Sequence, residues 1–180
     1  MRFVDFLKAT VLLSGASASA LAVVTAGAAA SSGDNHVVPI SAGWWVAASA
    51  IGLLLGRRAA VNPPIAGLLA GARFQTSLPE VRPGRILLNR LWPLLLSTIA
   101  AGALAFLYPQ VSGIAAGFAI IWALSWRRQE QAVTAIEERD GVRFYVQRTS
   151  PFKPIRLVRT PWFRTGAWES NGAQVRTGAG

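Results

Sequence analysis

The chain has 180 residues, of which 52% are apolar and only 14% are charged, against roughly 25% charged residues in soluble domains. Basic residues outnumber acidic residues 18 to 8, and there is no cysteine. This composition favours a membrane protein, and it excludes disulfides, thiolate metal sites and cysteine nucleophiles.

The first long apolar stretch is residues 10–30, TVLLSGASASALAVVTAGAAA. It is long enough for a helix that crosses a bilayer, which needs about 20 residues. Its small residues at intervals of four, Ser14, Ala18, Ala22, Ala26 and Ala30, predict a smooth packing face. An alternative is a secretory signal peptide, because MRFVDFLK precedes the stretch and AGAAASSG ends it. The stretch is longer than the roughly 7–15 residues of a signal core, so we favour a retained helix.

The second stretch, residues 38–55, has tryptophans near its start and arginines just after its end. Trp44 and Trp45 carry rings that prefer the headgroup layer, and Arg57 and Arg58 are typical of the cytoplasmic end of a span. The stretch therefore predicts a transmembrane helix that runs from outside to inside. Gly52 and Gly56 lie one turn apart and predict a face for close helix packing. 

A shorter apolar segment follows at VNPPIAGLLAGARF, residues 61–74. Asn62 can cap a helix whose first turn holds Pro63 and Pro64. The segment is too short to cross a bilayer. We therefore expect an interfacial helix over about residues 63–74, with a re-entrant segment as a weaker alternative.

The third and fourth spans are predicted at residues 91–108 and 109–126. The link YPQ between their apolar parts is so short that they should form a tight antiparallel hairpin. Gly113 and Gly117 form a GxxxG pair that lets another helix approach closely. We expect this pair to pack within the bundle, and the alternative is a face for a second chain.

The basic residues fix the predicted topology. Two precede the first span, six lie between the second and third spans, and ten follow the fourth, whereas the other two links contain none. All 18 therefore fall on one side, and the positive-inside rule places both termini in the cytoplasm.

After the bundle, residues 127–169 form a basic cytoplasmic tail. RRQEQAVTAIEERDG favours a helical extension that ends at Gly141, with a hairpin turning at Asp140-Gly141 as the alternative. Residues 142–148 alternate like a strand, and residues 155–159 could return as a second strand, which predicts a short β-hairpin. The acidic cluster Glu137, Glu138 and Asp140 is interpreted as a solvated helix end. Residues 170–180 are predicted to be disordered.

The tail interleaves basic and aromatic residues, which favours contact with anionic headgroups or with a partner. The candidate contact residues are Arg143, Arg148, Lys153, Arg156, Arg159, Trp162 and Arg164. The open alternative is that these arginines only enforce topology. We expect no nucleic-acid partner, because no recognisable binding module is present.

The residues needed for catalysis are scarce. The single histidine, His36, lies beside Asp34 in the link after the first span, and two such ligands make a poor metal site. Serines in the spans have no base to activate them, and no ionisable residue lies inside a span. We therefore predict no catalytic, cofactor-binding or metal-binding residues and no enzyme activity.

The sequence as a whole predicts an all-α integral membrane protein. Residues 1–126 would form a four-helix transmembrane bundle with both termini inside, followed by the small basic tail with its helical extension and β-hairpin. The Ala, Gly and Arg richness suggests a bacterial source, and hence the inner membrane. We expect a non-enzymatic accessory, scaffold or assembly subunit that acts through a protein partner, a second copy or the anionic lipid surface. The alternative is a small oligomeric channel or transporter.

Overall fold

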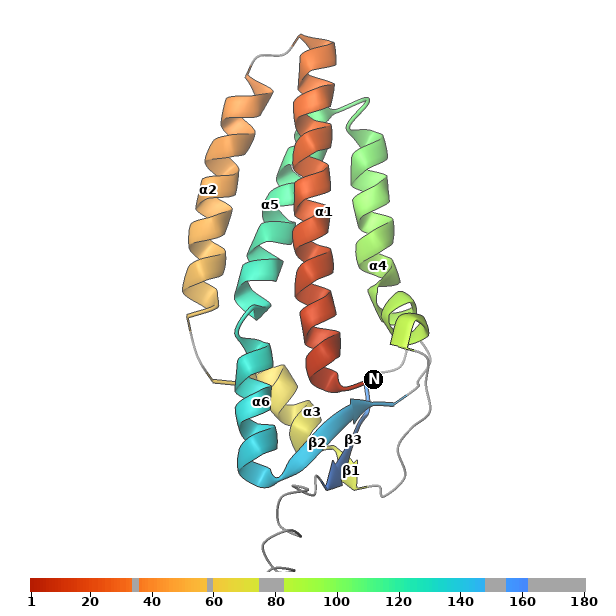
Figure 1. The fold of residues 1–180 in the computed structure, drawn as a ribbon. Coiled ribbons are helices and arrows are strands. Elements are labelled where there is room, and N and C mark those ends of the chain that lie inside the picture. Colours follow the sequence, from red (N-terminus) through yellow and green to blue (C-terminus); the bar gives the residue numbers. More distant parts are fainter. Residues whose placement is uncertain (34–35, 58–59, 75–82, 148–154, 162–180) are drawn as a thin grey trace, which may run out of the picture.

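The computed structural model describes residues 1–33, 36–57, 60–74, 83–147 and 155–161. The helices are α1 (Phe3–Ser32), α2 (Val37–Leu55), α3 (Pro63–Ala70), α4 (Pro83–Leu104), α5 (Pro109–Trp126) and α6 (Gln129–Asp140). The strands are β1 (Arg73–Phe74), β2 (Val142–Val146) and β3 (Leu157–Pro161). Long helices stand side by side, and the short helices and the strands gather at one end of them (Figure 1).

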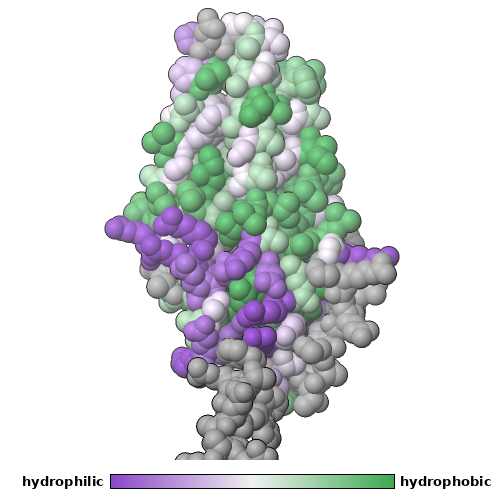
Figure 2. Space-filling model, in the orientation of Figure 1, coloured by the Kyte–Doolittle hydropathy of each residue, from purple (hydrophilic) through white to green (hydrophobic). Residues whose placement is uncertain are grey.

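Four helices within the described ranges are long and apolar enough to cross a membrane. They are α1, α2, α4 and the stretch Pro109–Asp140, which comprises α5 and α6. Large apolar side chains point outward from them, since Leu12 is 72% exposed and Val23 is 73% exposed. Figure 2 shows this apolar surface over the bundle, with hydrophilic residues below it. Such a surface is typical of helices that face lipid, and the prediction of a mostly helical chain with four candidate spans is confirmed.

Helix α5 packs most extensively against α1 and α2, and less extensively against α4. The predicted tight pairing of the third and fourth spans is therefore only a minor contact. The reason is local: the chain turns at residues 105–108, after α4 ends at Leu104. The short turn joins the two helices at one end, and α1 separates much of their remaining length by packing against both.

The buried face of α1 differs from the predicted stripe of small residues. Ser14 and Ala18 are buried, but Ala26 and Ala30 are exposed. A helix turns about 100° per residue, so steps of four drift by about 40° each and leave the face after a few turns. The face that stays buried advances by alternating steps of three and four residues, through Leu21, Thr25 and Ala28 among others. Steps of three and four residues average close to the roughly 3.6 residues of a helical turn, so the buried positions stay on one face along the helix.

The strands form a three-stranded sheet in the order β1-β3-β2. Strand β3 is antiparallel to β2 and parallel to β1. The β2–β3 pair is the predicted hairpin, whereas β1 was not expected and makes the all-α description incomplete. Helix α6 ends at Gly141, whose φ of 61° is the left-handed conformation that glycine adopts easily. The chain therefore leaves a helix at Gly141, and the alternative hairpin at Asp140-Gly141 is wrong.

Candidate functional site

The N-terminus, α3, α6 and the sheet form one compact unit at the base of the bundle. We call Met1–Lys8 together with α3, α6 and the three strands the basal subdomain. The backbone of Met1 accepts a hydrogen bond from the N–H of Val146 at 3.1 Å. Arg2 forms a β-bridge with Tyr145. The first residues of the chain thus pair with the free edge of β2.

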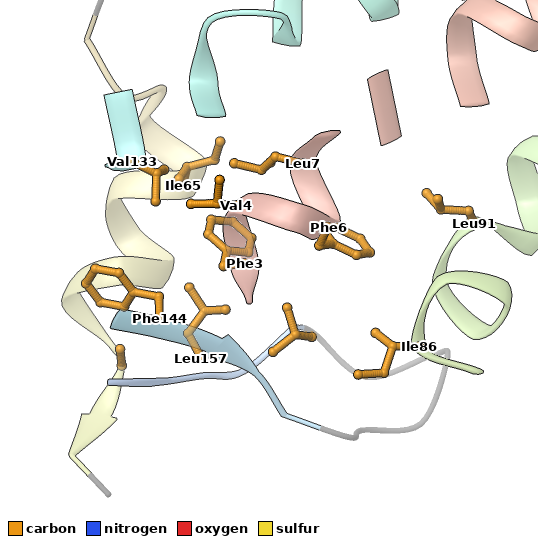
Figure 3. Close-up of a cluster of buried hydrophobic side chains, with 12 residues drawn as sticks. Phe3, Val4, Phe6, Leu7, Ile65, Ile86, Leu91, Val133, Phe144 and Leu157 are labelled. Carbon is orange, nitrogen blue, oxygen red and sulfur yellow. The ribbon is translucent and has the colours of Figure 1, made fainter. Parts of the chain in front are cut away.

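A single apolar core holds the basal subdomain together (Figure 3). The first two turns of α1 contribute Phe3, Val4, Phe6 and Leu7, all of them buried. Side chains of α3, α4, α6 and the sheet complete the core, and they include Ile65, Ile86, Leu91, Val133, Phe144 and Leu157. Helix α1 has 30 residues and is about 45 Å long at 1.5 Å per residue. It therefore has length to cross a bilayer core of about 30 Å and still enter this subdomain.

Glu137 connects α6 to both the N-terminus and the sheet. Its carboxylate accepts a hydrogen bond from Arg2 Nη2 at 2.7 Å and another from the Phe144 N–H at 2.9 Å. Glu137 is only 2% exposed, so its interpretation as part of a solvated helix end is wrong. The hydrogen bond with Glu137 raises the pKa of Arg2 above its usual range, against the opposing effect of burial. 

A second ion pair and a buried amide attach α6 to its neighbours. Lys8 Nζ lies 2.9 Å from a carboxylate oxygen of Glu130. The Gln129 side chain, which is also buried, accepts from the N–H of Asn62 at 2.9 Å and donates to the carbonyl of Ala60. Asn62 holds the N-cap position of α3 as expected, but its side chain makes no capping hydrogen bond. 

Helix α3 packs into this subdomain through Ile65, which is 1% exposed. It ends at Ala70, before the residue-74 limit expected from the sequence, and β1 begins at Arg73 after two intervening residues. Whether α3 also lies at a membrane interface stays a prediction.

A groove of about 430 Å³ lies between α3, α6 and the sheet. Its lining includes Leu69, Ile136, Arg139, Phe144 and Arg159. We call it the basal groove. The lining combines apolar side chains with the guanidinium groups of Arg139 and Arg159 and the carboxylate of Asp140.

The positive charge of Arg139, in the lining of the basal groove, is partly neutralised by the neighbouring Asp140. Arg139 makes two hydrogen bonds to the carboxylate of Asp140, at 2.7 and 3.3 Å. This contact lowers the pKa of Asp140 below its usual range and raises that of Arg139. Arg159, which also lines the groove, places its guanidinium carbon over the ring of Phe74, 5.8 Å from the ring centre. 

The predicted tail residues divide between the sheet and the undescribed part of the chain. Arg143 lies on β2, Arg156 is exposed just before β3, and Arg159 is exposed on β3. Arg148, Lys153, Trp162 and Arg164 lie outside the described residues. The structure therefore brings Arg143 and Arg159 onto neighbouring strands, and it leaves their predicted contact with lipid or a partner as a prediction.

The predicted packing glycines face other helices of the same chain. A Cβ on Gly52 would lie 2.8 Å from Leu124 Cβ, and a Cβ on Gly56 would meet the carbonyl oxygen of Leu124. A Cβ on Gly117 would collide with the indole of Trp44, and a Cβ on Gly113 would meet Ser41. These four glycines thus allow α2 and α5 to approach closely. 

Polar side chains reinforce the same helix contacts. Trp45 Nε1 donates to the carbonyl of Gly113 at 2.8 Å, and Trp44 Nε1 donates to that of Ile114 at 3.2 Å. The hydroxyls of Thr25 and Ser112 are 2.7 Å apart and buried between α1 and α5. The sequence reasoning placed the tryptophans at an interface and missed these bonds, although a ring N–H near small residues of another span could have suggested them.

No group of three or more His, Asp or Glu side chains that could hold a metal gathers among the described residues. His36 stands at the start of α2, at the opposite end of the bundle from the basal subdomain (Figure 1). Comparison with protein-family models, with curated proteins and with solved structures gives no match to this chain.

Proposed function

We propose that this chain is a multi-pass protein of a bacterial inner membrane, with both termini in the cytoplasm. In this proposal it is a non-enzymatic accessory, scaffold or assembly subunit, and the basal subdomain presents a basic surface to a protein partner or to anionic headgroups. The observation that carries the proposal is the shared core of the basal subdomain. This core contains the first turns of α1 and side chains from α4, so the subdomain is fixed to the apolar helices. 

The packing of the glycines supports a scaffold over an oligomeric channel. Gly52, Gly56, Gly113 and Gly117 are all used for contacts between helices of one chain. They are therefore not free to line a pore between copies. Hydroxyls in the helices also support a packing role, since Thr10, Ser14 and Thr25 donate to backbone carbonyls of their own helix.

Co-purification from native membranes tests the proposal. The wild type should retain a stoichiometric protein partner in mild detergent, or bind vesicles that contain anionic lipid. Charge reversal on the basal surface, Arg156→Glu with Arg159→Glu, should remove the interaction. Gln131→Glu, on the exposed side of α6, is the control and should retain it. A wild type that binds neither a partner nor anionic vesicles would contradict the proposed function.

A further inference from the structure

We propose that the end of α2, together with the turn between α5 and α6, binds the headgroup of an anionic phospholipid. Arg57 follows the last turn of α2, and Arg127 with Arg128 forms the turn that joins α5 to α6. All three side chains are exposed. We call these three residues the arginine site. It is separate from the tail residues of the proposed function, and it depends only on the part of that proposal in which the chain crosses a bilayer.

The close approach of α2 and α5 brings the arginine site together. At Gly56 the two backbones nearly touch, because a Cβ there would meet the carbonyl oxygen of Leu124. Next to this contact, Arg128 Nη1 donates to the backbone carbonyl of Arg57 at 3.2 Å. This hydrogen bond connects the end of α2 to the α5–α6 turn at the point where both carry arginines. A bound anion at this point would contact side chains from both elements.

The arginine site has no internal counter-ion among the residues that the structure describes. The ion pairs in these ranges are Arg2–Glu137, Lys8–Glu130 and Arg139–Asp140. Glu130, the acid nearest to Arg127 and Arg128 in the sequence, thereby pairs with Lys8. Guanidinium groups bind phosphate oxygens through paired hydrogen bonds and remain charged at every physiological pH. The clustered arginines at the end of α2 and in the α5–α6 turn would therefore attract a phosphate diester.

An apolar and aromatic surface leads up from the arginine site along α2 and α5. The rings of Trp44 and Phe118 meet edge to face with centroids 5.7 Å apart, which places them on the same side of the helix pair. One turn towards the arginines, Trp122 is 50% exposed and stacks on Trp126 at 5.4 Å. On α2, Leu55 is exposed near the same end.

This combination selects a lipid rather than a free phosphate ion. A phosphate ion would use only the arginines, whereas an acyl chain would also contact the exposed Phe118 and Trp122 on α5. Indole rings favour the headgroup level of a bilayer, and basic residues beside them favour anionic lipid at about 1 kcal/mol per well-placed cation. The chemistry therefore fits a phospholipid with net negative charge, such as phosphatidylglycerol.

Thermal unfolding of the purified full chain in a neutral detergent tests this inference. Phosphatidylglycerol should raise the melting temperature in a saturable manner, and phosphatidylcholine and inorganic phosphate should have much smaller effects. The site variant carries Arg57→Gln, Arg127→Gln and Arg128→Gln. It should unfold like the wild type without lipid and lose most of the lipid-dependent shift. The control carries Arg73→Gln and Arg85→Gln, removes two charges from exposed positions outside both the arginine site and the candidate tail contacts, and should keep the shift.

Three results would overturn the inference. The first is a site variant that responds to phosphatidylglycerol like the wild type. The second is an equal response to phosphatidylcholine, which would mean that the charge is not used. The third is an equal response to inorganic phosphate, which would indicate an ion site without a lipid chain. Carbonate extraction of native membranes separates this test from the proposed function, because a chain released by carbonate would contradict the membrane span itself.

Discussion

At the scale of single residues, Gly56 is a position where the structure leaves no room for a side chain. Its missing Cβ faces the backbone carbonyl of Leu124, which cannot rotate away as a side chain can. We expect Gly56→Ala to destabilise the protein by roughly 1–3 kcal/mol through overpacking, seen as a lower melting temperature in detergent. Gly43→Ala, in the same helix with no atom within 4 Å of the added Cβ, is the control and should be neutral. Equal melting temperatures for the two variants would contradict the α2–α5 packing.

Glu137 should be the most sensitive acidic residue of α6. Replacement by Ala removes the partners of the Arg2 guanidinium and of the Phe144 N–H. Loss of a hydrogen-bonded charge at a buried position costs about 1–3 kcal/mol. Glu138→Ala, at the exposed neighbouring position, should change stability by less than about 0.5 kcal/mol. Chemical denaturation of both variants measures the difference, and similar stabilities would show that the Arg2–Glu137 pair contributes little.

The contrast between these residues explains what the sequence can predict at this scale. The spacing of Gly52, Gly56, Gly113 and Gly117 marks them as packing positions, because small size and helical period are visible locally. The role of Glu137 depends on Arg2, which is 135 residues away in the chain. Nothing in the local pattern EERD distinguishes a buried acid from its solvated neighbour.

At the scale of elements, the spans, α6 and the β2–β3 hairpin are predictable from the sequence, whereas their assembly into the basal subdomain is not. A span needs only a continuous apolar stretch of sufficient length. The local sequence is therefore enough to locate it. The sheet requires β1 to meet β3 and Arg2 to meet Tyr145. Such pairings join distant segments, and β1 has only two residues, too few for an alternating pattern to reveal.

The first turns of α1 bear on the alternative of a cleaved signal peptide. Cleavage after the apolar stretch would remove Phe3, Val4, Phe6 and Leu7 from the basal core and leave Glu137 without Arg2. We therefore expect the mature protein to keep this segment, and peptide mass spectrometry of the purified protein should detect the peptide that contains Phe3 to Lys8. A mature N-terminus near Ser31 would contradict this prediction and remove α1 from the bundle.

The same contacts predict a loss of folding when the N-terminal segment is deleted. Removal of residues 2–7 should expose the apolar faces of α6 and the sheet, because these residues fill the space between them. We expect faster proteolysis of the basal subdomain in isolated membranes. Phe3→Leu, which conserves most of the buried volume, is the control and should resist proteolysis much like the wild type.

At the scale of the whole molecule, the two ends of the bundle differ sharply in charge. The end that carries the basal subdomain includes the arginines of α6 and the sheet, whereas the links after α1 and after α4 contain no Lys or Arg. An orientation with the basic end in the cytoplasm follows from the positive-inside rule. The fold agrees with this pattern, since α1 carries Asp5 and Lys8 in its basal turns and Arg127 with Arg128 follow the basal end of α5 (Figure 1).

Cysteine labelling in intact cells tests this orientation on a clean background, because the chain has no native cysteine. Gln110→Cys, at the start of α5, and His36→Cys, before α2, should react with a membrane-impermeant thiol reagent. Gln131→Cys and Ala135→Cys are both exposed on α6, and they should react only after the cells are opened. Their exposure makes them a matched control, since failure to react in intact cells then reports the membrane and not burial in the protein. Labelling of Gln131→Cys from outside, with Gln110→Cys protected, would invert the topology and place the basal subdomain on the outer face. Labelling of all four positions in intact cells would show that these helices do not separate two compartments.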